Sequence, residues 1–472
     1  MRQINIAAII TANLDYKPTV DQEKAIVALS EYVAENSNDS LFLLTGYAGT
    51  GKTSIISALV KSLEQLRLKS VLLAPTGRAA KVLASYSGRQ AFTIHKKIYR
   101  QKSSRDGVGT FSLDRNLHKE TFFIIDEASM INNRTADSSI FGSGRVLDDL
   151  FEYVYSGSGC KLILVGDTAQ LPPVGSDVSP ALDQRTLESY GFGVTAFELK
   201  EVVRQAASSG ILMNATGIRR IIGTYDAAQP QIDTDNFNDI IRIGGDGLID
   251  ELQAAYEATS KEETIVVVNS NKMANKYNQG IRNRIFFRED EVGPGDLLMV
   301  VKNNYFWLSG EEQSGFIANG DIAEVVSIGN YEERYGFRFA EVSLFFPDYQ
   351  EEIDAKIVLD TLHYDTPAMP EDKSRELYFS VLEDYPGLKS KKKQYEAVRE
   401  DPYFNALQVK FAYAVTCHKA QGGQWRRVFI DQGMFNSQEP TTEYLRWLYT
   451  ALTRATEKLY LVNFQSKFFS EQ

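Results

Sequence analysis

The chain has 472 residues, a formal net charge of −11 at pH 7, 43% hydrophobic residues and 24% charged residues. This length exceeds what one hydrophobic core supports and predicts about three or four folded units. The acidic balance excludes a uniformly basic nucleic-acid coat, but it does not exclude a local basic groove. Because the only cysteines are Cys160 and Cys417, a disulfide framework and a thiolate zinc cluster are both excluded.

The N-terminal run from Ile4 to Ile10 is mildly apolar but is broken by Asn5, and no stretch approaches a membrane-spanning length. We expect the edge of a strand or helix at this position rather than a signal peptide. The sequence therefore predicts a cytoplasmic protein that does not contact a membrane.

Apolar runs alternate with helical patterns over residues 1–205, which predicts a first α/β domain with a parallel sheet. Each run ends in a loop rich in Gly, Pro, Asp or Thr, where open α/β sheets bind ligands. A polar, Gly-containing piece at residues 99–119 interrupts the pattern and is expected to form an inserted β-hairpin. The strands expected in this domain are 41–44, 71–74, 122–125 and 162–165.

The same alternation returns in residues 206–330 and 406–472, which predicts a second α/β domain. Between these segments, residues 331–405 alternate aromatic and polar side chains, and we expect a small β-barrel-like insertion there. The lysine-rich run at 389–393 is either a solvated helix face or a nucleic-acid contact. The strands expected in the second domain are 264–268, 409–416, 428–430 and 459–462.

A complete phosphate-binding loop, G-x-x-x-x-G-K-T, occupies residues 46–53 directly after the first apolar run. Its glycines let the backbone amides turn toward phosphate oxygens, Lys52 supplies a positive charge, and the Thr53 hydroxyl is suited to Mg²⁺. A helix beginning near Thr53 adds its N-terminal dipole. The sequence thus predicts ATP and Mg²⁺ as cofactors; the loop residues expected to bind the nucleotide are Gly46, Ala48, Gly49, Thr50, Gly51, Lys52, Thr53 and Ser54.

Two further strand ends carry groups suited to phosphoryl transfer. Asp126 and Glu127 follow the third strand; Asp126 is a candidate Mg²⁺ partner with Thr53, and Glu127 is a candidate base for the attacking water. Read alone, this pair is more typical of a helix cap; together with the phosphate loop, it indicates catalysis. After the fourth strand, Gln170 is placed to hydrogen-bond a γ-phosphate or water.

At Val165–Pro173 the chain resembles the superfamily 1 helicases, and other sequence blocks before and after this one occur in that family's order. The resemblance covers roughly residues 18–464. Strings such as "APTGRAAK", "IIDEASM", "VGDTAQLPPVG" and "TCHKAQG" are most similar to the 5′-to-3′ branch that contains RecD and Dda.

This resemblance implies an ATP-dependent DNA helicase that moves 5′ to 3′ on single-stranded DNA. The implied fold has two RecA-like P-loop motor domains, a hairpin in the first that separates duplex strands as a pin, and an SH3-like barrel in the second. The implied partners are single-stranded DNA and duplex junctions, with single-strand-binding or repair proteins as candidates, and DNA repair or recombination as the setting. We expect a monomer.

The resemblance also assigns roles to single residues. Gln22 would read the adenine edge, Arg204 would reach the γ-phosphate, and Arg454 would act as an arginine finger from the second domain. With Lys52, Asp126, Glu127 and Gln170, these two arginines complete the predicted catalytic set. The residues implied to contact DNA are Pro75, Thr76, Thr93, His95, Phe111, Thr416 and His418.

Other interpretations of these residues remain open. His95 is also typical of a buried histidine, and Phe111, the candidate wedge of the pin, is equally consistent with a residue that packs the hairpin onto its domain. The alternative functions are a translocase that remodels protein–DNA complexes with little unwinding, and a nucleotide-gated binding module. RNA as the substrate is not excluded. No carboxylate-and-lysine nuclease centre is recognisable.

Overall fold

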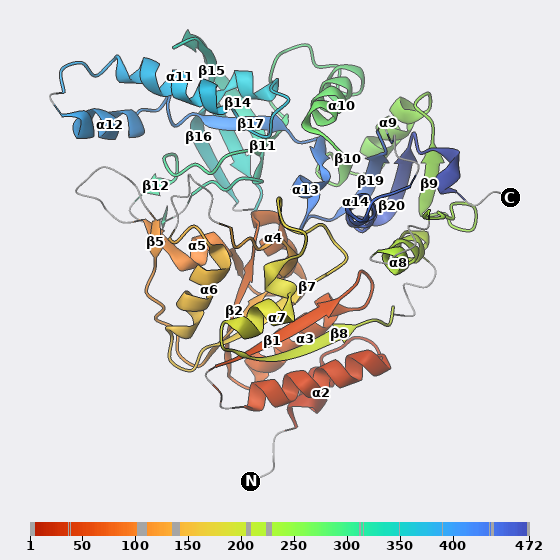
Figure 1. Cartoon of the computed structure of the whole chain (residues 1–472). Coiled ribbons are helices and arrows are strands. Elements are labelled where there is room, and N and C mark those ends of the chain that lie inside the picture. Colours follow the sequence, from red (N-terminus) through yellow and green to blue (C-terminus); the bar gives the residue numbers. More distant parts are fainter. Residues whose placement is uncertain are drawn as a thin grey trace.

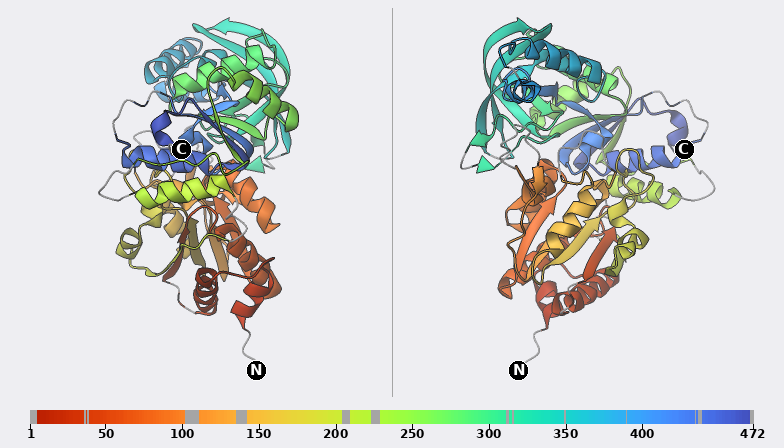
Figure 2. Two further views of the ribbon diagram at one scale, coloured as in Figure 1. Left: turned by 90° about the vertical axis from the view of Figure 1, so that its right-hand side faces the viewer. Right: turned by 60° about the vertical axis from the view of Figure 1, so that its left-hand side comes forward.

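The computed structural model has two lobes, a lower one formed by the N-terminal part of the chain and an upper one formed by the rest (Figure 1). Two further views show the same separation along the long axis of the molecule (Figure 2). The structure describes residues 5–35, 37, 39–101, 111–134, 142–203, 209–222, 229–310, 313–314, 316–348, 350–388, 390–433, 435 and 439–469.

Six parallel strands form the sheet of the lower lobe, in the order β3-β2-β6-β7-β1-β8. Strands β1 and β7 are buried along their whole length, as expected for parallel strands covered on both faces. The four predicted strands are confirmed. The bounds are β1 Ser40–Gly46, β2 Lys69–Ala74, β3 Ala91–Thr93, β6 Thr121–Ile125, β7 Lys161–Gly166 and β8 Gly193–Leu199.

Helices cover this sheet on both faces because successive strand residues point to opposite sides. On β1, Phe42 and Leu44 pack with α1, α2 and α3, whereas Leu41 and Leu43 pack with α5, α6 and α7. The helices are α1 Ile6–Ala12, α2 Val20–Ala34, α3 Lys52–Gln65, α4 Gly77–Ser87, α5 Ile94–Ile98, α6 Val146–Tyr155 and α7 Gln184–Ser189, with 3-10 turns η1 Ala128–Met130 and η2 Pro180–Leu182.

The predicted hairpin is present as β4 Tyr99–Gln101 and β5 Phe111–Leu113, which pair antiparallel. The segment that joins these strands lies outside the described residues. In Figure 1 the two strands stand at the top of the lower lobe, next to the barrel of the upper lobe.

A second parallel sheet lies in the upper lobe, with strand order β18-β10-β19-β20-β9. Together the two sheets form the paired RecA-like architecture. The strands are β9 Ile240–Ile243, β10 Thr264–Val268, β18 Ala414–Thr416, β19 Trp425–Asp431 and β20 Ala455–Val462; the helices are α8 Gly210–Ile221, α9 Leu248–Ala258, α10 Asn271–Arg284, α13 Cys417–Ala420 and α14 Thr442–Leu452, with η5 Ser466–Phe468.

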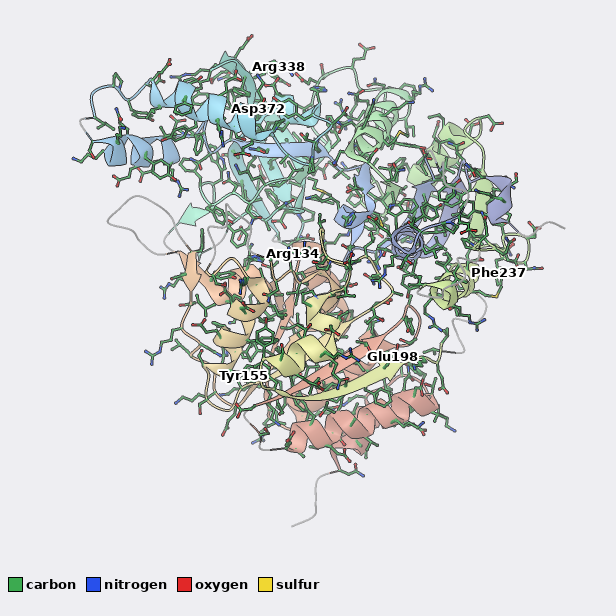
Figure 3. All side chains as sticks on the ribbon, viewed as in Figure 1. Arg134, Tyr155, Glu198, Phe237, Arg338 and Asp372 are labelled. Carbon is green, nitrogen blue, oxygen red and sulfur yellow. The ribbon has the colours of Figure 1, made fainter. Side chains whose placement is uncertain are left out.

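A closed barrel of five strands, β11-β14-β15-β16-β17, completes the upper lobe. Arg338 lies near its outer edge and Asp372 on the helix beside it, both far from the lower lobe (Figure 3). The elements of this region are β11 Leu297–Val300, β12 Ser309–Gly310, β13 Gln313–Ser314, β14 Ile322–Arg334, β15 Phe337–Phe346, β16 Glu351–Val358, η4 Leu359–Leu362, α11 Glu371–Leu382, α12 Lys391–Arg399 and β17 Leu407–Phe411.

Two sequence expectations need correction here. The barrel includes more of the sequence than the predicted insertion 331–405, because β11 and the start of β14 precede that range and β17 follows it. The single strand predicted at 409–416 is two strands, since β17 belongs to the barrel and β18 to the second sheet. The break falls at Ala412 and Tyr413, which are both buried and apolar enough to give no turn signal.

Among the described residues, no helix is long and apolar enough to cross a membrane.

Candidate functional site

The phosphate loop connects the end of β1 at Gly46 to the start of α3 at Lys52. Gly51 has a φ of 84°, in the left-handed region that favours glycine, and a Cβ there would lie 2.2 Å from Nε2 of Gln22. The loop backbone therefore depends on glycine, both for its turn and for the close approach of Gln22.

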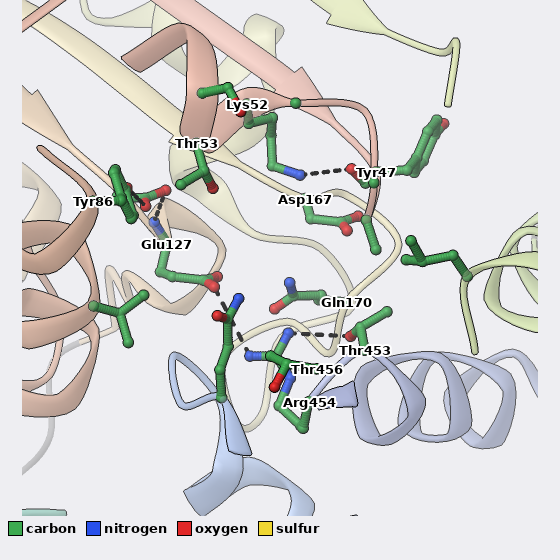
Figure 4. Close-up of a pocket in the computed structure, with 18 of the residues that line it drawn as sticks. Tyr47, Lys52, Thr53, Tyr86, Glu127, Asp167, Gln170, Thr453, Arg454 and Thr456 are labelled. Atoms are coloured by element: carbon green, nitrogen blue, oxygen red, sulfur yellow. Dashed lines mark hydrogen bonds and ion pairs between the residues drawn. The ribbon is translucent and has the colours of Figure 1, made fainter. Parts of the chain in front are cut away.

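Lys52 and Thr53 point from the first turn of α3 into one cleft (Figure 4). Nζ of Lys52 donates hydrogen bonds to the carbonyl oxygens of Gly46 at 2.7 Å and Tyr47 at 2.9 Å. These bonds hold the ammonium group against the phosphate loop, where the helix N-terminus also favours an anion.

The end of β6 delivers the two predicted carboxylates to the same cleft. Oδ1 of Asp126 accepts a hydrogen bond from the backbone amide of Glu127 at 2.9 Å, and the Tyr86 phenol donates to Oδ2 of Asp126. Glu127 has a φ of 53°, an uncommon backbone conformation for a residue other than glycine. Strained residues of this kind cluster at functional sites. Burial raises the pKa of Glu127, and the positive charge of Arg454 opposes this shift.

The loop after β7 contributes Asp167 and Gln170. Oδ1 of Asp167 accepts a hydrogen bond from the amide of Ala169 at 2.9 Å, which fixes the turn that carries Gln170. Gln170 is only 6% exposed and lines the cleft, and within the described part of the chain its Oε1 has no hydrogen-bond partner. A buried amide oxygen of this kind is available to a ligand or a water molecule.

Arg454 reaches the cleft from the second sheet, just after α14. Its Nε donates to the carbonyl oxygen of Thr450 at 3.0 Å and its Nη1 to that of Gly423 at 3.2 Å. Nη1 also lies 3.9 Å from Oε1 of Glu127 in the opposite domain. Arg454 is buried at 3% exposure, whereas the Glu127 side chain is 22% exposed. Arg204, the other predicted arginine, lies outside the described residues.

The cleft has a volume of about 510 Å³ and is lined by residues of both domains, including Lys52, Thr53, Ser54, Asp126 and Glu127. Among the described residues, no group of three or more His, Cys, Asp or Glu side chains could hold a metal. Thr53 and Asp126 both line the cleft, and a hydroxyl and a carboxylate suit Mg²⁺, which takes one or two protein ligands and completes its shell with water and phosphate oxygens.

The side-chain amide of Gln22 makes hydrogen bonds within the first domain. It is fully buried; its Oε1 accepts from the amide of Thr19 at 3.0 Å, and its Nε2 donates to the carbonyl of Thr50 at 2.9 Å and to the Tyr16 hydroxyl at 3.1 Å. Both hydrogens of Nε2 and one acceptor position of Oε1 are therefore in use within the protein, and the expected contact of Gln22 with adenine stays a prediction. In this structure Gln22 caps α2 and braces the phosphate loop.

The predicted DNA contacts of the first domain follow β2 and β3. The hydroxyl of Thr76 accepts from the amide of Ala79 and caps α4, and that of Thr93 accepts from the amide of Lys96 and caps α5. Pro75 directly precedes Thr76. His95 packs against Tyr99, with ring centroids 5.6 Å apart, and burial lowers its pKa to about 4. His95 is half-buried, and its environment favours the neutral form of the imidazole.

The second domain brings its predicted contacts to the end of β18. Thr416 precedes α13, and His418 lies within that helix, where burial lowers its pKa. The loop after α13 touches the first domain: a Cβ at Gly422 would lie 3.2 Å from Oγ1 of Thr76. The structure thus places Gly422 against the start of α4.

Phe111 is not an exposed wedge. Its side chain is 8% exposed, and its ring centroid lies 4.4 Å from that of Tyr305 and 6.2 Å from that of Phe316. The aromatic ring is covered because the hairpin packs against the segment after β11 of the upper lobe. This environment supports the interpretation in which Phe111 packs the hairpin, and its role as a wedge stays a prediction.

Two family models match the chain, an AAA domain over residues 19–220 and a UvrD-like helicase C-terminal domain over residues 411–462. The chain is 25% identical over 455 residues to the ATP-dependent RecD2 DNA helicase of Deinococcus radiodurans, covering 93% of this chain and 49% of that protein. It is also 25% identical over 296 residues to the ATP-dependent DNA helicase dda of Enterobacteria phage T4, covering 60% of this chain and 62% of that protein. By these matches, the chain is similar to the superfamily 1 helicases of the RecD- and Dda-like branch.

Among solved structures, a Pif1 helicase from Bacteroides in complex with ADP-AlF3 and ssDNA aligns with 97% of this chain and 95% of its own, at 16% identity and a TM-score of 0.48. This chain spans only part of the length of the curated relatives named above, 49% of RecD2 and 62% of dda.

Within this site, sequence reasoning missed three tyrosines. Tyr16 contacts Gln22, Tyr86 contacts Asp126, and Tyr449 of the second domain bonds to two loops of the first. Tyr449 stands five positions before Arg454, so its place next to a predicted catalytic residue was the available signal. Tyr86 ends the helix that begins at the "APTGRAAK" string and carries no signal of its own.

Proposed function

We propose that this chain is an ATP-dependent DNA helicase that moves 5′ to 3′ on single-stranded DNA and unwinds duplex DNA. One observation carries the proposal. Arg454 of the second motor domain lies 3.9 Å from Glu127 of the first, in the cleft that also holds the phosphate loop. A finger arginine and a base that come from different domains make hydrolysis depend on domain closure, as a motor requires.

Each group in the cleft has a separate task in ATP hydrolysis. Glu127 would orient and deprotonate the attacking water, and Gln170 would hold that water or the γ-phosphate through its amide. Lys52 and Arg454 would offset the charge that develops on the phosphate oxygens. Mg²⁺, held by Thr53 and Asp126, would supply further charge neutralisation when bound.

We place single-stranded DNA across the strand ends that carry Pro75, Thr76 and Thr93 in the first domain and Thr416 and His418 in the second. Small hydroxyl groups and backbone amides at these positions suit phosphate contacts that carry no sequence information. The contact between Gly422 and Thr76 supports a path that crosses both domains.

The first test is hydrolysis of ATP by the purified chain with and without a single-stranded oligonucleotide. We expect stimulation by DNA, with Lys52→Ala abolishing activity in both conditions. Equal rates with and without DNA would overturn the helicase proposal and favour a nucleotide-gated binding module.

Polarity is tested with two forked duplexes that differ only in whether the single-stranded tail is 5′ or 3′. We expect unwinding of the duplex with the 5′ tail and little unwinding of the other. A preference for the 3′ tail would overturn the direction of movement while leaving the motor assignment in place. Elution of the active species at the size of one chain would support the expected monomer.

The buried position of Phe111 favours one second candidate, a translocase that remodels protein–DNA complexes with little unwinding. The two functions are separated by comparing displacement of streptavidin from a biotinylated oligonucleotide with unwinding of the 5′-tailed fork. Displacement without unwinding would select the translocase, and comparable rates of both would select the helicase.

A further inference from the structure

Tyr449 spans the cleft between the two motor domains. It lies on α14 of the second domain and is 1% exposed. Its hydroxyl accepts a hydrogen bond from the backbone amide of Ala48 in the phosphate loop at 2.8 Å and donates one to Oδ2 of Asp167 at 2.6 Å. One buried hydroxyl therefore joins two loops of the first domain to a helix of the second.

The partners of this hydroxyl lie on the loops that handle the phosphates. Ala48 lies in the phosphate loop, whose amides bind phosphate oxygens, and its own amide donates to the Tyr449 hydroxyl. Asp167 anchors the turn that presents Gln170, through its bond to the amide of Ala169. Any movement of α14 relative to the first domain must break or form both bonds of the hydroxyl.

Thr450, which follows Tyr449 on α14, adds a further contact between the two domains. The amide of Leu171 donates to Oγ1 of Thr450 at 2.9 Å, and Nε2 of Gln421 donates to the carbonyl oxygen of Leu171 at 2.7 Å. The loop after β7 is thus held by α14 at two consecutive residues. Of these contacts, the one through Tyr449 also reaches the phosphate loop.

We propose that Tyr449 is a positioning residue that fixes the Asp167–Gln170 turn relative to the phosphate loop when the motor domains close. Its hydroxyl does not react; it acts through Asp167 and the Ala48 amide. This inference rests on the proposed DNA-stimulated ATPase. It accounts for how closure at α14 is transmitted to Gln170 in the opposite domain, in addition to the direct approach of Arg454.

The test is Tyr449→Phe, which removes the hydroxyl and leaves the buried ring in place. We expect kcat of DNA-stimulated hydrolysis to fall about tenfold, the cost of losing a buried hydrogen bond to a charged group. KM for ATP should change by less than about twofold, because loss of a positioning contact acts on the transition state more than on binding. The matched control is Tyr460→Phe, whose hydroxyl accepts from Arg427 at 3.2 Å within the second sheet.

A second variant tests the same bond from the other domain. Asp167→Asn alone should lower kcat, and the double variant with Tyr449→Phe should fall no further than the lower of the two single variants. Additive effects, a Tyr449→Phe enzyme with normal kcat, or an equal fall in the control would overturn the inference. Absence of DNA stimulation in the unaltered protein would instead overturn the proposed function itself.

Discussion

The phenol of Tyr86 donates a hydrogen bond to Oδ2 of Asp126, the carboxylate assigned to Mg²⁺. Tyr86 belongs to α4, whose first residues approach the second domain at Gly422. The backbone of Tyr86 is also fixed, because its carbonyl oxygen accepts from the Ser57 hydroxyl of α3 at 2.8 Å. One helix therefore links the domain interface to the metal carboxylate.

Removing the phenol should weaken the metal site. Groups that hydrogen-bond a metal ligand orient it, and their loss typically costs about 10- to 100-fold in metal affinity. We expect Tyr86→Phe to raise the Mg²⁺ concentration for half-maximal ATPase by about tenfold. The control is Tyr155→Phe, whose hydroxyl donates to the carbonyl oxygen of Ser40, away from the cleft. An unchanged Mg²⁺ requirement would show that Asp126 needs no support from Tyr86.

Arg454 should be irreplaceable even by lysine. The guanidinium bonds to Thr450 and Gly423 while it faces Glu127, and an ammonium group cannot make these contacts together. An arginine finger contributes about 10³-fold or more to kcat, so Arg454→Lys should lose about that factor. Binding of a fluorescent ADP analogue should persist, since the phosphate loop is intact. Loss of nucleotide binding in parallel with kcat would contradict the role of a finger.

The pH dependence of hydrolysis should report Glu127. Burial raises the pKa of this carboxyl, so it takes up its proton, and stops acting as a base, at a higher pH than an ordinary glutamate. We expect kcat to fall on the acid side at a pH above the usual value of about 4.3. Because Arg454 lowers this pKa, Arg454→Met should move the acid limb to still higher pH. An acid limb that stays in place would indicate that another group controls it.

The sequence predicted which residues meet at the site more successfully than it predicted the side-chain contacts that they make there. Lys52, Glu127 and Gln170 each follow a recognisable strand, and the carboxyl ends of parallel strands meet at one edge, so their convergence was predictable. The burial of Gln22 could also have been inferred. Thr19 and Gln22 form the T-x-x-Q signature of a capping box, which already uses the glutamine side chain.

Contacts between distant segments could not be predicted in the same way. The ring of Phe111 is covered by Tyr305 and Phe316, which lie in the other lobe and about two hundred positions along the chain. The apolar run 409–416 gave no sign that its two halves join different sheets, because burial in either sheet selects the same residue types.

Packing at Phe111 leads to a prediction opposite to that for a wedge. Truncation of a buried phenylalanine typically costs about 3–5 kcal/mol, so Phe111→Ala should lower the free energy of unfolding by about 3 kcal/mol, with a smaller loss for Phe111→Leu. The hairpin would then lose its contact with the upper lobe.

Urea unfolding followed by far-UV circular dichroism measures this loss. At a temperature where the variant is folded, a packing role predicts that ATPase and unwinding fall by similar factors, because the two lobes are less well held together. A wedge predicts selective loss of unwinding with unchanged stability and DNA-stimulated ATPase. That second result would return Phe111 to the duplex junction, since a stacked aromatic contributes about 1–3 kcal/mol to holding a base.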